Sequence, residues 1–300
     1  MTTKQKELMI KSLIKGYSIE TTPNVYAKYG EFIKLLPEKN DVYVTYLPDE
    51  NSENVISTSK KLIDEGFNAI PHLPARTIKD ISELEKYIGA LSEIAGCKKI
   101  LVIGGGGIQK GDINSSMQVL KTDLLSKYNF SEVGVAGHPE GNPDISQDEL
   151  DKAIIEKNEF AQNIDFKLYL ATQFFFEAKI LKKWEEHLSN LKNKLEIHAG
   201  IPGPATIKTL ISYATACGIG NSIRFLTKQA LNITKLATSK TPDKLITDLA
   251  DYKQSNPHSK LVKLHFYAFG GIKKTSDWLN LISNSSLKIN ANNEFEPIEK

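Results

Sequence analysis

The sequence predicts an α/β protein that folds as a closed (β/α)8 TIM barrel in a single domain. Short apolar segments of strand length alternate with helical segments along the 300 residues, and there are eight such strands. Strands that alternate with helices form parallel sheets from βαβ units, and eight units at this length are typical of a barrel. An open doubly wound sheet with a second domain is the alternative, but no linker, repeat or low-complexity segment marks a domain boundary.

The strand segments are short and rich in β-branched and aromatic residues, which favour sheets. Glycine, proline or polar residues follow them and interrupt regular structure. In chain order the predicted strands are Tyr17–Glu20, Asp41–Tyr46, Asn68–His72, Lys99–Ile103, Val133–Ala136, Leu168–Ala171, Leu195–Gly200 and Leu261–Tyr267.

Helical periodicity occupies the intervals between the strands. The predicted helices are Thr3–Lys15, Val25–Leu36, Val55–Glu65, Ile78–Ala95, Met117–Lys127, Asp148–Gln162, Ile180–Lys192, Ala205–Cys217, Ser222–Thr238, Thr241–Tyr252 and Asp277–Ile282. The predicted organisation is an N-terminal helix over residues 1–16, the barrel over residues 17–282 and a loose polar tail over residues 283–300.

Composition and charge exclude several classes of protein. The net charge is only +2, so we expect neither a polyanion-binding surface nor a nucleic-acid partner. The two cysteines, Cys97 and Cys217, form no C-x-x-C pattern, which fits a reducing compartment and argues against a disulfide framework. The N-terminal segment has no long apolar run, so we expect no signal peptide, no membrane span and a cytoplasmic location.

The stretch Leu168–Glu177, with the sequence LYLATQFFFE, is the most informative. A short apolar strand ends at the polar pair Thr172 and Gln173, and three phenylalanines follow. At the C-terminal end of a barrel strand, a side-chain amide beside aromatic rings suits a flat heteroaromatic ligand. The alternative is a capping glutamine beside a core cluster of phenylalanines.

The other predicted strand ends carry an acid, neutral hydrogen-bonding groups, aromatic rings and glycines. These are Glu20, Thr45, Tyr46, His72, the run Gly104–Gly107, His138 with Asn142, and Tyr267. Two histidines without a carboxylate pair make a poor ligand set, so we expect no metal. No nucleophile elbow is present either.

Two of these strand ends have both a structural and a chemical interpretation. The run Gly104–Gly107 is either a flexible loop or a backbone that a ligand approaches closely, and it matches neither a P-loop nor a dinucleotide fingerprint. Glu20 is either an exposed rim residue or a partly desolvated carboxyl group, which holds its proton more readily and suits a general acid.

Several motifs in order along the chain resemble those of a known family. They are VTY (Val44–Tyr46), IPHL (Ile70–Leu73), VAGHPEGNP (Val135–Pro143), ATQFFFE (Ala171–Glu177), AGIPGP (Ala199–Pro204) and LHFY (Leu264–Tyr267). From about Tyr17 to about Trp278, the chain resembles the bacterial, catalytic-domain-only form of the methylenetetrahydrofolate reductase family.

The resemblance implies a flavin-dependent barrel that reduces 5,10-methylenetetrahydrofolate to 5-methyltetrahydrofolate, with electrons from NADH or NADPH passing through FAD. Glu20 matches the family's general acid, and Gln173 matches the glutamine that hydrogen-bonds folate and nicotinamide in turn. FAD-contacting positions correspond to Thr45, Tyr46, His72, Gly104, Gly105, Gly106, Ala136, His138, Asn142 and Lys157. Substrate-contacting positions correspond to Glu20, Thr45, Gln173, Tyr213 and Tyr267. We also expect a homo-oligomer.

The chain departs from the family pattern at charged positions. Gly104, Gly105 and Gly106 replace the usual Arg-Gly-Asp, and the folate-contacting arginine is replaced near Gly271, with Lys273 and Lys274 just beyond. Loss of a carboxylate near the flavin would favour the reduced, anionic flavin and oxidation of methyltetrahydrofolate. The alternatives are a paralogue acting on another C1-carrying pterin and a non-catalytic flavin- or folate-binding subunit.

Overall fold

The computed structural model describes residues 3–106, 108–229, 237 and 239–298. Eight parallel strands close into a barrel in the order β1-β10-β7-β6-β5-β4-β3-β2, which confirms the predicted (β/α)8 fold. Each strand coincides with a predicted one to within a few residues. The strands are β1 (Ser18–Thr21), β2 (Asp41–Val44), β3 (Asn68–Pro74), β4 (Lys99–Ile103), β5 (Glu132–Gly137), β6 (Lys167–Phe174), β7 (Glu196–Pro202) and β10 (Leu261–Tyr267).

The chain divides into two compact units. The β1–β5 unit comprises Ser18–Gly137 and Ile155–Ala171. The β7–β10 unit comprises Met1–Tyr17, His138–Ile154 and Thr172–Lys300. The predicted domain boundaries after residues 16 and 282 stay predictions.

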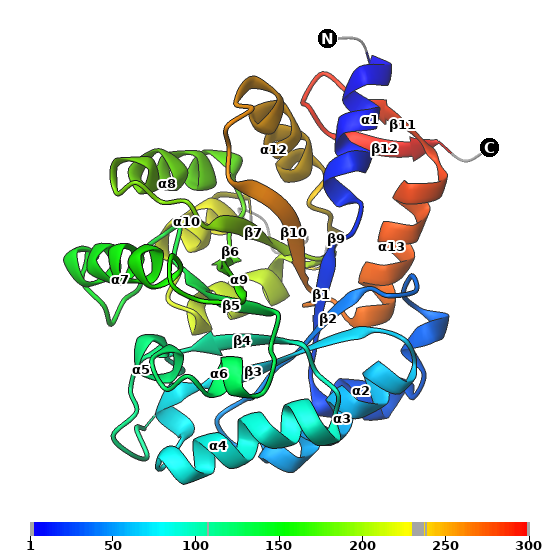
Figure 1. Cartoon of the computed structure of the whole chain (residues 1–300). Helices are drawn as coiled ribbons and strands as arrows, with labels where there is room; N and C mark the ends of the chain where they lie inside the picture. The colour runs from blue at the N-terminus through cyan, green and yellow to red at the C-terminus, as the bar shows by residue number, and fades with distance from the viewer. Residues whose placement is uncertain (1–2, 107, 230–236, 238, 299–300) are drawn as a thin grey trace. The chain divides into compact units, whose positions relative to one another are not determined.

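In the β1–β5 unit, helices follow the strands and cover them on the outside; α3, for example, lies beside β3 (Figure 1). Side chains of Asn51, Asp80 and Ser115 accept hydrogen bonds from backbone N–H groups and so cap α3, α4 and α5. The helical elements are α2 (Pro23–Tyr29), η1 (Phe32–Lys34), α3 (Ser52–Asp64), η2 (Ala75–Thr77), α4 (Ile81–Gly89), η3 (Ala90–Ile94), α5 (Ser116–Leu120) and α6 (Leu124–Lys127).

Two helices predicted as continuous are each broken in two. The segment Val25–Leu36 ends its first helix at Gly30, which adopts a φ of 77°. The segment Met117–Lys127 is interrupted before Asp123, which has a φ of 57°. A residue with left-handed backbone cannot continue a right-handed helix. The periodic pattern therefore predicted helical structure correctly but missed the break in each helix.

The interior of the β1–β5 unit contains large side chains from successive strands. Tyr43, Ile70, Leu101 and Tyr169 form one buried cluster, and the hydroxyls of Tyr43 and Tyr169 are 2.7 Å apart. Gly134 leaves room for the Tyr169 ring, because a Cβ atom there would lie 2.9 Å from the ring. A buried hydroxyl without a hydrogen-bond partner is costly, and these two hydroxyls avoid that cost by pairing with each other.

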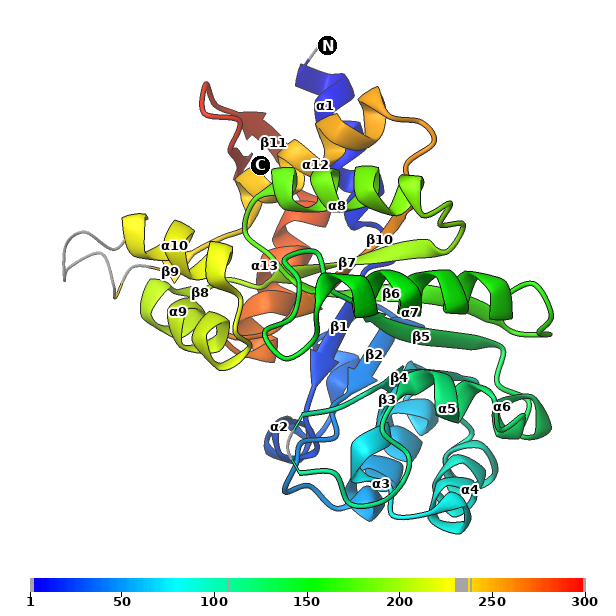
Figure 2. The ribbon, with the colours of Figure 1, turned by 90° about the vertical axis from the view of Figure 1, so that its left-hand side faces the viewer.

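The β7–β10 unit contains β7 and β10 in parallel register and the helices around them. The helices α9 and α10 lie side by side (Figure 2). The predicted helix Ser222–Thr238 is confirmed as far as Gln229, and most of its remainder lies outside the described residues. The elements are α1 (Thr3–Ile14), α7 (Gln147–Phe160, which begins here), α8 (Ala178–Asn190), β8 (Ala205–Thr206), α9 (Ile207–Ala216), α10 (Gly220–Gln229), β9 (Ser239–Lys240), α12 (Asp243–Ser255) and α13 (Ile272–Asn284).

Within the segment 283–300, predicted as a loose polar tail, residues 286–298 fold into an antiparallel hairpin, so the prediction was wrong for this described part. It consists of β11 (Ser286–Ile289) and β12 (Phe295–Ile298), and it lies beside α1 (Figure 1). The side chain of Asn293 in its turn donates to the carboxylates of Asp248 (2.6 Å) and Asp251 (3.0 Å) on α12. The Phe295 ring stacks on Trp278.

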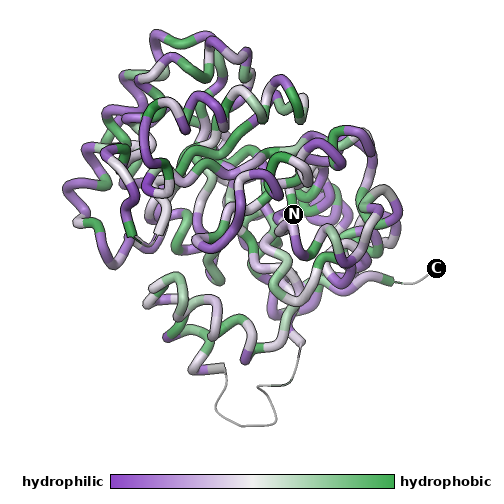
Figure 3. The backbone as a smooth tube through the Cα atoms, turned by 90° about the horizontal axis from the view of Figure 1, so that it is seen from below, coloured by the Kyte–Doolittle hydropathy of each residue, from purple (hydrophilic) through white to green (hydrophobic). Residues whose placement is uncertain are grey.

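Hydrophobic and hydrophilic residues alternate along the helices, whereas the strands are mainly hydrophobic (Figure 3). This is the pattern of helices with one face against a sheet and the other in water. Within the described part of the chain, no helix is both long enough and apolar enough to cross a bilayer.

We predict that Phe295→Ala lowers the free energy of unfolding by about 3 kcal/mol, because it empties a buried site. Ile298 on the same strand is 48% exposed against 3% for Phe295, so Ile298→Ala should cost no more than about 0.5 kcal/mol. Urea denaturation followed by circular dichroism measures both. Equal, small losses would show that the hairpin is not packed as described.

Candidate active site

In the β1–β5 unit, the parallel strands bring their C-terminal ends to one edge, and two titratable side chains meet there. Glu20 Oε2 on β1 lies 3.7 Å from His72 Nε2 on β3, and both side chains are mostly buried. Tyr87 donates to the backbone carbonyl of His72, and the Tyr43 ring lies edge-on to the imidazole. Glu20 and His72, predicted separately from the sequence, thus lie next to each other at this edge, at a separation longer than a hydrogen bond.

Thr45 and Tyr46 follow β2 on the same edge. The Thr45 backbone N–H donates to Thr21, but its buried Oγ1 has no hydrogen-bond partner among the described residues. A buried hydroxyl without a partner is costly, so this atom is a natural contact for a polar group of a ligand. Tyr46 packs edge-on against Tyr87, and burial raises the pKa of the Tyr46 hydroxyl.

The glycine run follows β4 on this edge, and only one of its described members is needed by the fold. Gly105 has a φ of 84°, and a Cβ atom there would lie 2.7 Å from Pro74 Cβ. At Gly104 the nearest atom would be 3.9 Å away, and at Gly106 nothing lies within 4 Å. The fold therefore requires glycine at position 105 and tolerates side chains at positions 104 and 106. Gly107 lies outside the described residues.

Lys157 is a buried cation on the part of α7 that belongs to this unit. Burial lowers the pKa of Lys157 to about 8, and the charge of Glu156 offsets only part of that effect. An anionic group such as a phosphate would stabilise the charged form of this side chain. Ala136, near the end of β5, is half-buried.

In the β7–β10 unit, the end of β6 is tied to two neighbouring strands. The Gly200 N–H donates to Thr172 Oγ1 (2.8 Å), and the Tyr267 hydroxyl donates to the Thr172 carbonyl (3.0 Å). Gln173 comes next, half-buried, and its Oε1 accepts from the Phe174 N–H (3.1 Å). Tyr267, predicted to contact substrate, thus has its hydroxyl committed to holding the strand that carries Gln173.

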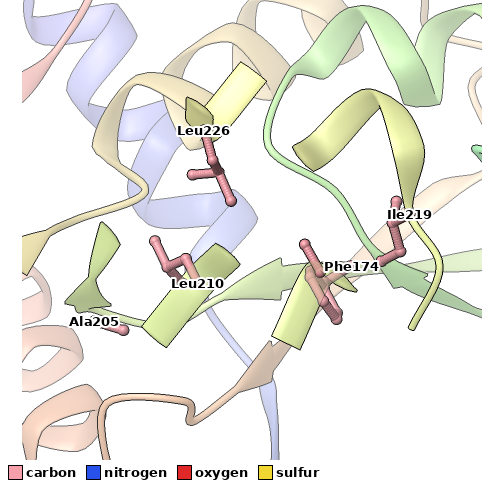
Figure 4. Packing of buried hydrophobic residues seen from close by; sticks show 6 residues of the cluster. Phe174, Ala205, Leu210, Ile219 and Leu226 are labelled. Carbon is pink, nitrogen blue, oxygen red and sulfur yellow. The ribbon is translucent and has the colours of Figure 1, made fainter. Parts of the chain in front are cut away.

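The phenylalanines after Gln173 are mainly core residues. Phe174 and Phe175 are fully buried, and Phe174 packs with Leu210, Ile219 and Leu226 of the α9–α10 region (Figure 4). Phe174 and Phe175 therefore belong to a core cluster, as the alternative interpretation of this stretch predicted, and their buried rings do not face a ligand. Phe176 is only half-buried and stacks on Phe225.

The exposed aromatic ring of this unit is Tyr213 on α9, which is 43% exposed. One of its faces stacks on Phe269, with ring centroids 4.1 Å apart, and Phe269 also stacks on Tyr267. Phe269 was missed by the sequence interpretation. Phe269 lies two residues after Tyr267, the last residue of β10, and this short spacing between two aromatic residues could have indicated their contact.

His138 and Asn142 lie on the loop after β5, both half-buried. Gly141, with a φ of 79°, closes a tight turn by donating its N–H to the His138 carbonyl. Asn142 Oδ1 accepts from the Asp144 N–H (2.9 Å), so its amide oxygen is directed to its own loop. Across the described residues, no group of three or more His, Cys, Asp or Glu side chains could hold a metal ion.

These features define a barrel with an acid, a histidine and neutral hydrogen-bonding groups at its strand ends. A family model for methylenetetrahydrofolate reductase matches residues 24–269. Because the match covers most of the chain, the protein belongs to the methylenetetrahydrofolate reductase family.

Two solved structures also align with the chain at low similarity. Deoxyribose phosphate aldolase from Aeropyrum pernix shares 11% identity over 93% of this chain and 99% of its own, with a TM-score of 0.42. A xylose isomerase domain containing protein from Salmonella typhimurium LT2 shares 11% identity over 89% of this chain and 96% of its own, with a TM-score of 0.45. Similarity at this level carries no information about the reaction.

We predict that Gly105→Ala costs about 1–2 kcal/mol of stability, because alanine is strained at this φ and its methyl group would contact Pro74. Gly106→Ala should change stability by less than about 0.5 kcal/mol, because its methyl group enters open space. Thermal unfolding of the two variants measures the difference. A Gly106 variant as damaged as the Gly105 variant would contradict the described loop.

Proposed function

We propose that this protein is an FAD-dependent oxidoreductase that interconverts 5,10-methylenetetrahydrofolate and 5-methyltetrahydrofolate. The observation that carries the proposal is the family match over residues 24–269. Glu20 and Gln173, which correspond to the family's acid and glutamine, support it. NADH or NADPH as the electron partner, a role in one-carbon and methionine metabolism, a cytoplasmic location and a homo-oligomeric state belong to the same proposal.

The chemistry of several predicted contacts fits FAD. Thr45 offers a buried hydroxyl whose oxygen has no hydrogen-bond partner among the residues described, and Lys157 offers a buried cation. Gly104 and Gly106 leave open space at the loop after β4. These residues would hold the cofactor together with Tyr46, His72, Gly105, Ala136, His138 and Asn142. When bound, FAD would supply hydride transfer between nicotinamide and folate.

Glu20 is the residue to which we assign the proton transfer. As general acid it would protonate the folate nitrogen that is released when the methylene bridge opens. His72, whose Nε2 lies 3.7 Å from Glu20 Oε2, would return a proton to Glu20 between turnovers after a small side-chain movement. The low exposure of both side chains limits competing proton exchange with water.

Gln173 and Tyr213 are the residues to which we assign substrate recognition. The carboxamide of Gln173 can both donate to and accept from a ring edge, once its oxygen leaves the Phe174 N–H. Tyr213 would contact a substrate ring through its exposed surface, while Phe269 supports its other face. Tyr267 would act through the strand end that it holds.

We predict that Glu20→Gln slows flavin oxidation by methylenetetrahydrofolate by about 10²–10⁴-fold, because the amide cannot donate the required proton. Reduction of the flavin by NADH or NADPH should change by less than about twofold, because that step does not use the acid. Anaerobic stopped-flow absorbance of the two half-reactions tests this directly. A variant with an unimpaired folate half-reaction would exclude Glu20 as the acid.

We further propose that the glycine at position 106 raises the flavin reduction potential and favours oxidation of methyltetrahydrofolate. Gly106→Asp should fit the open space at this position and lower the potential, by roughly 20 mV for each kcal/mol of repulsion it adds to the reduced flavin. Gly106→Asn is the matched neutral control. Anaerobic dye titration measures the potentials. An unchanged potential in the aspartate variant would contradict this explanation.

A second candidate is a paralogue that acts on another C1-carrying pterin. The family's folate-contacting arginine is replaced near Gly271, whose φ of 105° is one that residues with a side chain rarely adopt. Tight FAD binding without turnover of tetrahydrofolate substrates would favour this candidate. Absence of turnover with any C1 pterin would instead favour a non-catalytic flavin- or folate-binding subunit.

A further inference from the structure

Glu140 joins the loop after β5 to the first turn of α10. Its Oε2 accepts from the Ser222 N–H at 3.0 Å, and its Oε1 accepts from the Ser222 hydroxyl. Ser222 is only 2% exposed. A carboxylate that accepts two hydrogen bonds at a helix N-terminus gains from its charge and from the helix dipole. The two partners are 82 positions apart in the sequence, so this is a tertiary contact and not a local turn.

The same loop meets the α9–α10 corner at a second point. Gly218, between the two helices, has a φ of 65°. A Cβ atom there would lie 2.7 Å from Pro143 Cγ, so Pro143 packs directly over this glycine. The turn closed by Gly141 presents Glu140 between His138 and Asn142. The position of the loop is therefore set by the helix pair as well as by its own hydrogen bonds.

The helix pair in turn packs on the strand end that carries Gln173. Leu210 of α9, Leu226 of α10 and Ile219 between them form one buried cluster with Phe174 (Figure 4). Tyr213 lies on α9, three residues after Leu210. A contact that fixes α10 thus acts on both Phe174 and the helix that presents Tyr213.

We propose that Glu140 is a positioning residue that couples the flavin loop, residues 138–143, to the α9–α10 pair and its Tyr213. This rests on the proposed function, in which His138 and Asn142 contact FAD and Tyr213 contacts folate. Cofactor and substrate then bind cooperatively, because each favours the same arrangement of loop and helices. Loss of the Glu140–Ser222 contact weakens both binding events without touching the acid Glu20.

The test compares Glu140→Gln with a matched control in the same segment. Glu149 accepts from the N–H and the hydroxyl of Ser146, but that contact is local to the start of α7. Glu140→Gln should raise the FAD dissociation constant and the KM for 5-methyltetrahydrofolate about tenfold each, while kcat changes less than about twofold. Glu149→Gln should leave all three values unchanged. Equal effects in both variants, or an effect on kcat alone, would overturn the proposal.

A second variant and a ligand-independent measurement keep the test decisive. Ser222→Ala removes only the hydroxyl donor, and the double variant with Glu140→Gln should be less impaired than the sum of the two single variants. Amide hydrogen exchange of the apoprotein should speed up in both segments, 138–145 and 217–229, in Glu140→Gln and not in Glu149→Gln. Unchanged exchange in segment 217–229 would exclude the coupling. A wild-type protein that binds no FAD would contradict the proposed function, and the exchange data would still decide the coupling.

Discussion

The close packing around Thr172 is the constraint on which the rest of the site depends in the β7–β10 unit. The side chain is fully buried, its hydroxyl accepts from the Gly200 N–H, and its carbonyl accepts from the Tyr267 hydroxyl. A Cβ atom at position 200 would lie 2.6 Å from the Thr172 carbonyl oxygen, so only glycine permits this approach. Three strands therefore meet at one residue, and the direction of the chain beyond it is fixed.

That fixed direction separates the chemical roles of the next residues. Phe174 enters the core beneath α9 and α10, whereas Gln173 stays half-buried, and its amide can exchange its present hydrogen bond for one to a ligand.

Elsewhere in this unit, a buried carboxylate accepts hydrogen bonds that hold neighbouring segments together. Glu185 accepts from Tyr252, Ser259 and the Lys260 N–H, and burial together with Glu185 raises the pKa of Tyr252 to about 12. Glu20 differs because its neighbour His72 can itself gain or lose a proton.

The barrel could be predicted from the sequence because its strands are short apolar runs bounded by glycine, proline and polar residues. Glu20, Thr45 and His72 could be placed at one edge for the same reason. The break at Asp123 and the C-terminal hairpin could not be predicted in this way. The hairpin depends on non-local packing, such as Phe295 on Trp278 and Asn293 on α12, and the break at Asp123 is a left-handed backbone conformation at a single residue. Neither leaves a periodic signal in the sequence.

The contacts that define the surroundings of the site were hidden for a similar reason. Phe269 and Glu140 lie in loops, where residue type alone does not reveal a partner. Phe269 meets Tyr213 and Glu140 meets Ser222 only because the fold brings distant segments together. The glycine run gave a partial signal. Backbone geometry requires glycine at position 105, but the sequence alone does not distinguish this position from the neighbouring glycines.

The most direct test of the account is a titration of the apoprotein with FAD, followed by anaerobic addition of 5-methyltetrahydrofolate. We expect the protein to bind FAD stoichiometrically and the folate to bleach the flavin absorbance. A protein that takes up no FAD would contradict the account, because the positions assigned to the cofactor would then hold no cofactor.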